Sequence, residues 1–231
     1  MQALRRALRS PWAHLVIAFL VFGLVQAVCI KVFSVPSGSM QTTLEVGDRI
    51  LVDRTAGWFG RQPQRGDVIV FTTDDDWETA TTATPAWKAV IKGTLGAFGY
   101  GPGNAHHLVK RVIATGGDTV SCCDAEGHLQ VNGEALDEPY VYDDLPFTAG
   151  VLDCDTTPRS RRCLPEITVP EGSLLVLGDH RSVSSDSVIA CRGLTDADPA
   201  ADGCARFADE RDVVGHVVAI AWPLPRLSGA P

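Results

Sequence analysis

The chain has 231 residues, 20 basic and 28 acidic side chains, and a hydrophobic fraction of 45%. That length and apolar content suit one folded domain with an accessory sub-domain, and they exclude a disordered or collagen-like chain. The net charge of −8 also argues against nucleic-acid binding, because a protein that neutralises phosphates needs a basic surface.

The first 31 residues differ in charge from the rest of the chain. Three arginines and Lys31 give them a charge of +4, which leaves −12 for the remainder. Between these cations lies Trp12 to Ile30, in which only His14 and Gln26 are clearly polar. A helix of that length is roughly 28 Å long, close to the thickness of the hydrocarbon core of a bilayer. The larger positive charge before it predicts a transmembrane anchor whose N-terminus stays in the cytoplasm.

A cleaved signal peptide is the main alternative for this segment. Its apolar region would be shorter and would end at a small-x-small cleavage site, whereas here the apolar run continues to Ile30. A lipoprotein modification of Cys29 does not fit, because Val28 rather than a small residue precedes it. We therefore expect residues 1–31 to form a cytoplasmic tail and an uncleaved single-pass anchor. Residues 32–231 would then lie outside the cytoplasm, at the plasma membrane.

The rest of the chain favours β-structure. Short apolar, β-branched runs alternate with turn signals, among them several Gly-Asp pairs and the hairpin signal Asn132-Gly133. No long stretch after residue 32 has a helical apolar period, so a mainly all-β fold is expected. The predicted strands are Ile50–Val52, Val68–Phe71, Leu108–Ala114, Thr119–Ser121, Leu129–Val131, Tyr140–Tyr142, Leu174–Leu177 and Val213–Ala221.

Two segments interrupt this pattern and are expected to be loops or a small accessory sub-domain. Residues 72–107 are rich in Thr, Asp, Gly and Pro, and residues 122–170 hold four cysteines and many acids. The core would then comprise about residues 32–121 and 171–223, with a variable insertion at about 122–170. In the first segment Trp77 could contact lipid or cover the sheet, and its sequence context does not decide between these.

Seven cysteines favour an oxidising compartment. Cys29 lies in the apolar segment, and the adjacent Cys122 and Cys123 are expected to pair poorly with each other. No Cys-x-x-Cys or His-x-x-His spacing supports a metal site, so neither a metal nor a cofactor is expected. The pairings that would close short loops are Cys154 with Cys163 and Cys191 with Cys204.

One serine and one lysine stand out as candidates for chemistry. Ser39 follows Ile30 so closely that an extended chain leaves it within about 30 Å of the membrane. A nucleophilic serine needs a base, and no histidine lies in a recognisable catalytic motif. Lys110 lies in an apolar run, where its same-face neighbours on a strand are Leu108 and Val112. Burial there would lower the pKa of Lys110 and let its neutral amine accept the serine proton.

Simpler interpretations of both residues remain open at this point. Ser39 can be an ordinary polar loop residue, and Lys110 can belong to an edge strand from which it reaches solvent. The other lysines lie in the first insertion or at the membrane. Lys110 is therefore the best candidate for a general base.

Four blocks of sequence resemble, in the same order, those of bacterial type I signal peptidases, the membrane-anchored Ser/Lys proteases that remove signal peptides from exported proteins. With the anchor they span residues 13–187, and the segment from Gly215 to Trp222 resembles the closing strand of that family. The two insertions fall where the family varies. The blocks run from Pro36 to Asp48, from Arg65 to Phe71, from Val109 to Asp118 and from Leu177 to Ser187.

The resemblance implies a role for each matching residue. Ser39 would be the nucleophile and Lys110 its general base, and the Ser39 backbone N–H and the Ser37 hydroxyl would form an oxyanion hole. Ser184 would hydrogen-bond to Lys110 and orient it, and Asp186 would support the site from behind. The remaining residues of the matching motifs are Met40, Gly178, Asp179 and Arg181.

The resemblance also implies the fold and the partners. The fold would be two antiparallel β-sheets with a variable β or loop insertion, preceded by one transmembrane helix. Substrates would be signal-peptide-bearing preproteins that bind as an added strand and present small residues at the third and first positions before the cut. The protein would contact plasma-membrane lipid, act as a monomer and bind no nucleic acid.

Three residues depart from the family pattern, and they leave other functions open. Without an arginine at position 188, Asp186 lacks its expected partner, which Arg181 or Arg192 could replace. A catalytically inactive anchored scaffold and a self-cleaving protein are the alternative functions. The departures are Thr42 for a usual proline, His180 for a common asparagine and Val188 for a usual arginine.

Overall fold

The structure is a computed structural model, and it describes residues 10–73, 77 and 107–231. Most of the predicted insertion at 72–107 lies outside the described residues. The elements are α2 (Pro11–Val28), β1 (Ile30–Ser34), β2 (Arg49–Asp53), η1 (Ala56–Phe59), β3 (Val68–Thr72), β4 (His107–Thr115), β5 (Thr119–Cys122), β6 (Leu129–Val131), β7 (Glu134–Ala135), β8 (Leu164–Thr168), β9 (Ser173–Leu177), η3 (Arg181–Val183), β10 (Ala208–Asp209), η4 (Glu210–Asp212), β11 (Val213–Trp222) and η5 (Leu224–Arg226).

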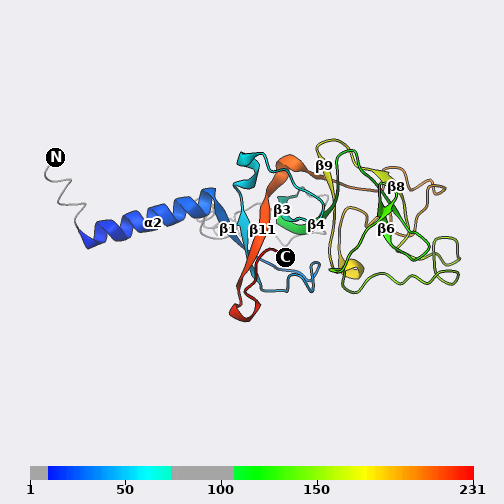
Figure 1. Cartoon of the computed structure of the whole chain (residues 1–231), viewed down its shortest axis with the longest axis horizontal. Helices are drawn as coiled ribbons and strands as arrows, with labels where there is room; N and C mark the ends of the chain where they lie inside the picture. Colours follow the sequence, from blue (N-terminus) through cyan, green and yellow to red (C-terminus); the bar gives the residue numbers. More distant parts are fainter. Residues whose placement is uncertain (1–9, 74–76, 78–106) are drawn as a thin grey trace, which may run out of the picture.

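The strands form two antiparallel sheets. The larger sheet has seven strands in the order β1-β2-β11-β3-β4-β9-β10, and the smaller has four in the order β7-β6-β5-β8. Helix α2 projects from one end of the molecule, the larger sheet lies in the middle, and the smaller sheet lies at the opposite end (Figure 1). The expected pair of antiparallel sheets is therefore confirmed.

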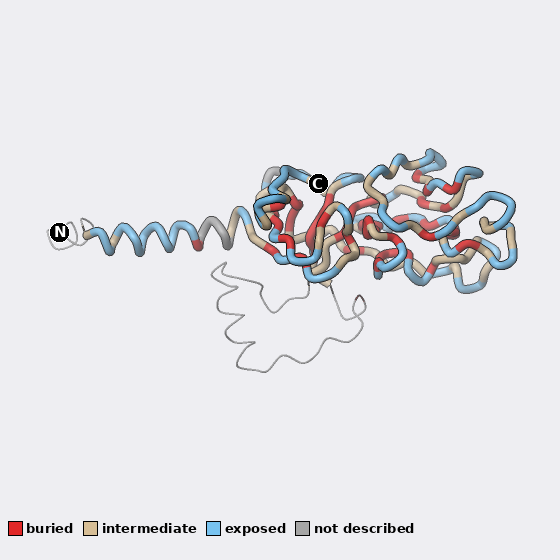
Figure 2. Tube along the Cα trace, turned by 90° about the horizontal axis from the view of Figure 1, so that it is seen from below, coloured by how far each residue is buried: buried red, intermediate tan, exposed pale blue. Residues whose placement is uncertain are grey.

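The helix is shorter than the predicted apolar segment. It ends at Val28, because the chain from Ile30 onward pairs with β2, beginning with Ile30 opposite Asp53. Many of its large apolar side chains are exposed, Leu15 and Phe19 among them, and Figure 2 shows most of the helix before its grey stretch as exposed. Within the described ranges, no helix combines the length and the apolar character that a membrane crossing requires.

Alternation along the strands divides the apolar side chains of the larger sheet between its two faces. On β3, Val68 and Val70 join one buried cluster, whereas Ile69 and Phe71 join another. Lys110 lies directly opposite Ile69 in the β3–β4 register, and residues directly opposite one another share a face. The lysine therefore leaves β4 on a face made of apolar side chains.

Asn132 and Gly133 form the predicted two-residue hairpin turn between β6 and β7. Both have positive φ, of 56° and 78°, which matches the turn geometry that Asn-Gly favours.

The predicted strand at Tyr140–Tyr142 is wrong. The segment forms a turn whose one sheet-like contact is a bridge from Tyr142 to His180. Its groups make tertiary contacts instead of strand pairs. The Tyr140 ring covers the Arg111 guanidinium at 4.0 Å, and the Tyr142 N–H donates to the Asp179 carbonyl at 2.8 Å. The segment thus packs against Arg111 of β4 and the chain just after β9 instead of forming a strand.

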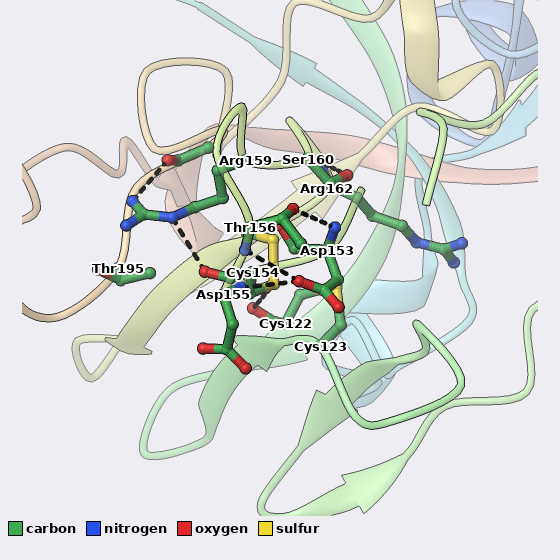
Figure 3. The surroundings of a disulfide bond; sticks show 12 residues. Cys122, Cys123, Asp153, Cys154, Asp155, Thr156, Arg159, Ser160, Arg162 and Thr195 are labelled. Atoms are coloured by element: carbon green, nitrogen blue, oxygen red, sulfur yellow. Dashed lines mark hydrogen bonds between the residues drawn. A yellow bond between two sulfur atoms is a disulfide. The ribbon is translucent and has the colours of Figure 1, made fainter. Parts of the chain in front are cut away.

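The cysteine prediction is wrong at one pair. The two pairings suggested by spacing are present, but the adjacent cysteines are also joined, and the peptide bond between them is cis. Figure 3 shows this pair beside Cys154, whose sulfur lies 3.8 Å from the Cys122 carbonyl oxygen. The disulfides are Cys122–Cys123, Cys154–Cys163 and Cys191–Cys204.

Candidate functional site

Lys110 of β4 lies in contact with Ser39, which is in the turn after β1. The Lys110 Nζ lies 2.8 Å from the Ser39 Oγ and hydrogen-bonds to it. Lys110 is 2% exposed, and Ser39 is partly buried in the turn that follows β1. The edge-strand interpretation of Lys110 is wrong, because β4 lies between β3 and β9.

The surroundings of Lys110 favour its neutral form. Loss of hydration on burial is the largest cause that lowers the pKa of Lys110 from 10.5 to about 8. The negative charges of Asp186 and Asp179 raise the pKa, and the positive charge of Arg206 lowers it. The ammonium form donates to the Ser39 Oγ, whereas the neutral amine at the same distance can accept the hydroxyl proton.

The turn that carries Ser39 is fixed on two sides. Next to it, Met40 is 1% exposed and belongs to the apolar cluster of β2 and β11. The Ser39 carbonyl accepts a hydrogen bond from the His180 N–H at 3.1 Å. A Cβ added to Gly178 would lie 2.4 Å from the Ser39 carbonyl oxygen and 2.3 Å from the Ser184 Oγ. Only glycine allows the chain after β9 to approach the turn that carries Ser39 this closely.

Ser184 does not make the hydrogen bond to Lys110 that the family resemblance implied. Its side chain is buried beside Gly178, and its Oγ has no hydrogen-bond partner among the described residues.

A buried ion pair joins the four sequence blocks. Asp179 accepts two hydrogen bonds from Arg111, at 2.9 and 2.7 Å, and a third from the Thr43 hydroxyl at 2.6 Å. Arg111 also donates to the Gly66 carbonyl at 2.9 Å. Charge-assisted, two-pronged contacts of this kind fix geometry strongly. The sequence matched each block separately, and this pair shows why their positions depend on one another.

The partner of Asp186 is Arg192. Asp186 is fully buried, and its carboxylate lies 3.0 Å from the Arg192 Nη2. Arg181, the other candidate, pairs instead with Glu138 at 2.5 Å. Val188, at the position of the usual arginine, is buried and donates its backbone N–H to Asp186 at 3.3 Å. The missing charge is thus supplied from farther along the chain.

An apolar groove of about 610 Å³ runs past the Ser39–Lys110 pair. Strand β1 and the turn after it form one wall, which includes the exposed Ser37. The other wall comes from β4 and from Val183 and Ser185. In the described part of the chain β1 pairs only with β2, so its outer edge can accept another extended strand.

The sequence left open whether Trp77 contacts lipid or covers the sheet, and in the structure it covers the sheet. Its ring packs edge-on against Phe71 at 5.3 Å, and the Arg206 guanidinium lies 4.4 Å over the ring. Sequence reasoning missed Arg206 altogether, because it follows a loop outside all four blocks and no pattern marks it. The disulfide spacing between Cys191 and Cys204 was the one signal that this loop folds back.

Comparison with known proteins gives consistent matches. The family model described as signal peptidase, peptidase S26, matches residues 9–222. Signal peptidase I of Mycobacterium tuberculosis is 35% identical over 232 residues, which cover 97% of this chain and 76% of that protein. A probable signal peptidase I of Mycobacterium leprae is 34% identical, over 94% of this chain and 78% of that protein. A crystal structure of a signal peptidase I from Enterococcus faecalis is 24% identical with a TM-score of 0.34, over 68% of this chain and 97% of that one.

Proposed function

The chain belongs to the signal peptidase family, peptidase S26, and we propose that its reaction is carried out by Ser39 as nucleophile and Lys110 as general base. Family membership makes the protein a serine endopeptidase that removes signal peptides from preproteins. The observation that supports the residue assignment is the 2.8 Å contact between a buried lysine amine and a serine hydroxyl.

The proposed steps follow from that contact. Neutral Lys110 takes the hydroxyl proton as the Ser39 Oγ attacks the scissile carbonyl, and a tetrahedral oxyanion forms. The resulting ammonium gives its proton to the leaving amine, which leaves an acyl-enzyme on Ser39. A water molecule then attacks the ester with Lys110 again as base. The Ser39 N–H and the Ser37 hydroxyl are the proposed donors to the oxyanion, and one such donor supplies about 3–4 kcal/mol.

The groove suggests how the substrate binds. We expect the signal peptide's last residues to lie extended along β1, adding a strand to the free edge of the larger sheet. Alternate side chains of an extended peptide point to one face, so the third and first residues before the cut would enter the groove together. Its walls around Val183 and Leu108 are apolar, which suits small apolar side chains at both positions.

The position of the protein in the cell is proposed from its first residues. The apolar segment Trp12–Ile30, flanked by three arginines and Lys31, would anchor the chain in the plasma membrane with its N-terminus in the cytoplasm. The exposed apolar side chains of α2 support this. Residues 32–231 would then act as a monomeric extracytoplasmic peptidase domain, close to lipid.

Cleavage of a preprotein with an Ala-x-Ala site tests the assignment. We expect the wild type to release a product whose new N-terminus follows the second alanine. Ser39→Ala and Lys110→Ala should each lower the rate by at least about a hundredfold, since both remove a group that acts in the transition state. Ser121→Ala, on the smaller sheet, is the matched control and should cleave like the wild type. Full activity of either site variant would end the assignment.

A further inference from the structure

One arginine beside the site belongs to none of the four blocks and has no part in the steps above. We propose that Arg206 is a positioning residue of the Ser39–Lys110 pair, which holds the segment Ser185–Ser187 at the groove and acts on Lys110 through its positive charge. The inference rests on the proposed roles of Ser39 and Lys110.

Arg206 binds three consecutive residues of the last sequence block. Its Nε donates to the Asp186 carbonyl at 3.1 Å, and its Nη2 donates to the Ser185 Oγ at 2.6 Å. Its backbone N–H donates to the Ser187 carbonyl at 2.9 Å. A planar guanidinium with several donors can fix two groups at once, which a lysine cannot do in the same way.

The same guanidinium lies against a wall of the groove. It stacks 4.4 Å over the ring of Trp77, which in turn packs on Phe71 of β3. Trp77 and Ser185 both line the groove beside Ser39. Arg206 therefore links the groove wall to the segment that carries Asp186. Loss of its contacts would change the position of both.

A disulfide brings two arginines to Asp186. Arg192 follows Cys191 directly, and Arg206 comes two residues after its partner Cys204. Arg192 binds the Asp186 carboxylate, whereas Arg206 binds the Asp186 carbonyl. The cross-link limits how far the loop can depart. This loop thus supplies the cations that position 188, a valine in this chain, does not provide.

The charge of Arg206 acts on the reacting amine. The charged groups that influence Lys110 are Asp186 and Asp179, which raise its pKa, and Arg206, which lowers it. Each of the two carboxylates already binds an arginine of its own. Removing the Arg206 charge would leave the carboxylates to stabilise the ammonium form, so less Lys110 would be neutral at a given pH.

The dependence of kcat/KM on pH tests this inference in the full-length protein. We expect the wild-type rate to rise through a midpoint near pH 8, as kcat/KM reports the ionisation of the free enzyme. Arg206→Gln should move the midpoint to higher pH and lower kcat/KM near neutrality by about three- to tenfold, because one pKa unit corresponds to a tenfold change. Arg206→Lys should keep the midpoint but lower kcat. Lysine retains the positive charge but cannot bind two groups at once as the planar guanidinium does. The control is Arg211→Gln, because Arg211 is exposed and pairs with Asp209.

The outcomes separate this inference from the proposed function. A wild-type midpoint and rate in Arg206→Gln would overturn the inference while the Ser39–Lys110 assignment stands. If Arg206→Gln does not fold, Arg206→Lys decides: a wild-type kcat, or a midpoint shifted upward despite the retained charge, overturns it. A wild type that does not cleave removes the proposed function and the inference with it.

Discussion

The larger and the smaller sheet of this molecule are each stabilised by different interactions. Around the proposed active site, ion pairs of the larger sheet are buried, and in Arg111–Asp179 the side chains are only 6% and 1% exposed. The region of the smaller sheet keeps its ion pairs nearer the surface, as in Arg159–Asp198 with 33% and 34% exposure. It is instead cross-linked by Cys154–Cys163 and by a vicinal disulfide.

The difference follows from what each region has to bury. The smaller sheet includes strands of only two and three residues, and its core is an apolar cluster that it shares with β4 and β9 of the larger sheet. Its disulfides add cross-links that restrict the unfolded chain. The larger sheet has buried apolar clusters on both faces. Its buried charges fix the geometry of a site more strictly than apolar contacts do.

The largest expected effect is on stability at the buried pair. Asp179→Asn should lower the free energy of unfolding by about 3–5 kcal/mol, because it leaves Arg111 buried without its counter-charge. Denaturant unfolding measures this. Arg61→Gln breaks a pair whose arginine is 53% exposed, and it should cost less than about 1 kcal/mol. Equal effects of the two variants would contradict the contrast between buried and exposed charge.

The next effect is on activity at the point of closest approach. Gly178→Ala should lower kcat by about a hundredfold, since the new Cβ must displace the Ser39 carbonyl or Ser184, and a shift of about 1 Å at a reacting group has an effect of that size. Gly57→Ala is the matched control, because nothing lies within 4 Å of its added Cβ. An active Gly178→Ala protein would show that the turn tolerates displacement.

The smallest effect is expected at the other end of the molecule. The double variant Cys154→Ser, Cys163→Ser removes a cross-link over a short loop and should lower stability by about 2 kcal/mol. Preprotein cleavage below the unfolding transition should stay close to that of the wild type, because this loop does not line the groove. A large loss of kcat in folded protein would mean that the smaller sheet shapes the site.

Periodicity and turn chemistry predicted most of the larger sheet. The runs that became β3, β4, β9 and β11 are apolar and β-branched, so local preference and burial agree there. Strand β1 was not predicted, and its first residue, Ile30, was assigned to the apolar anchor. Strands β7, β8 and β10 were not predicted either, since short or polar strands are defined by their neighbours rather than by their own pattern. The Tyr140–Tyr142 segment failed for the same reason, as its tertiary contact to Arg111 overrides its local preference.

For the site too, local sequence predicted some residues, whereas other contacts depend on the tertiary structure. Ser39 and Lys110 could be proposed from the sequence because an apolar strand with one lysine is unusual, and because their blocks resemble a family. The sequence left the partner of Asp186 open between Arg181 and Arg192, and it did not predict the contacts of Ser184 or Arg206. All of these depend on how the chain after β9 folds back on itself. The Cys122–Cys123 bond was missed because the usual separation of neighbouring residues argued against it.

The central claim is that neutral Lys110 activates Ser39. It is tested most directly by the rate at which a β-lactam-type acylating inhibitor labels Ser39, followed by mass spectrometry across pH. The account predicts labelling of Ser39 that rises with pH through a midpoint near 8 and is lost in Lys110→Met, a variant of similar shape without the amine. Labelling that does not change with pH, or that persists in Lys110→Met, would contradict it.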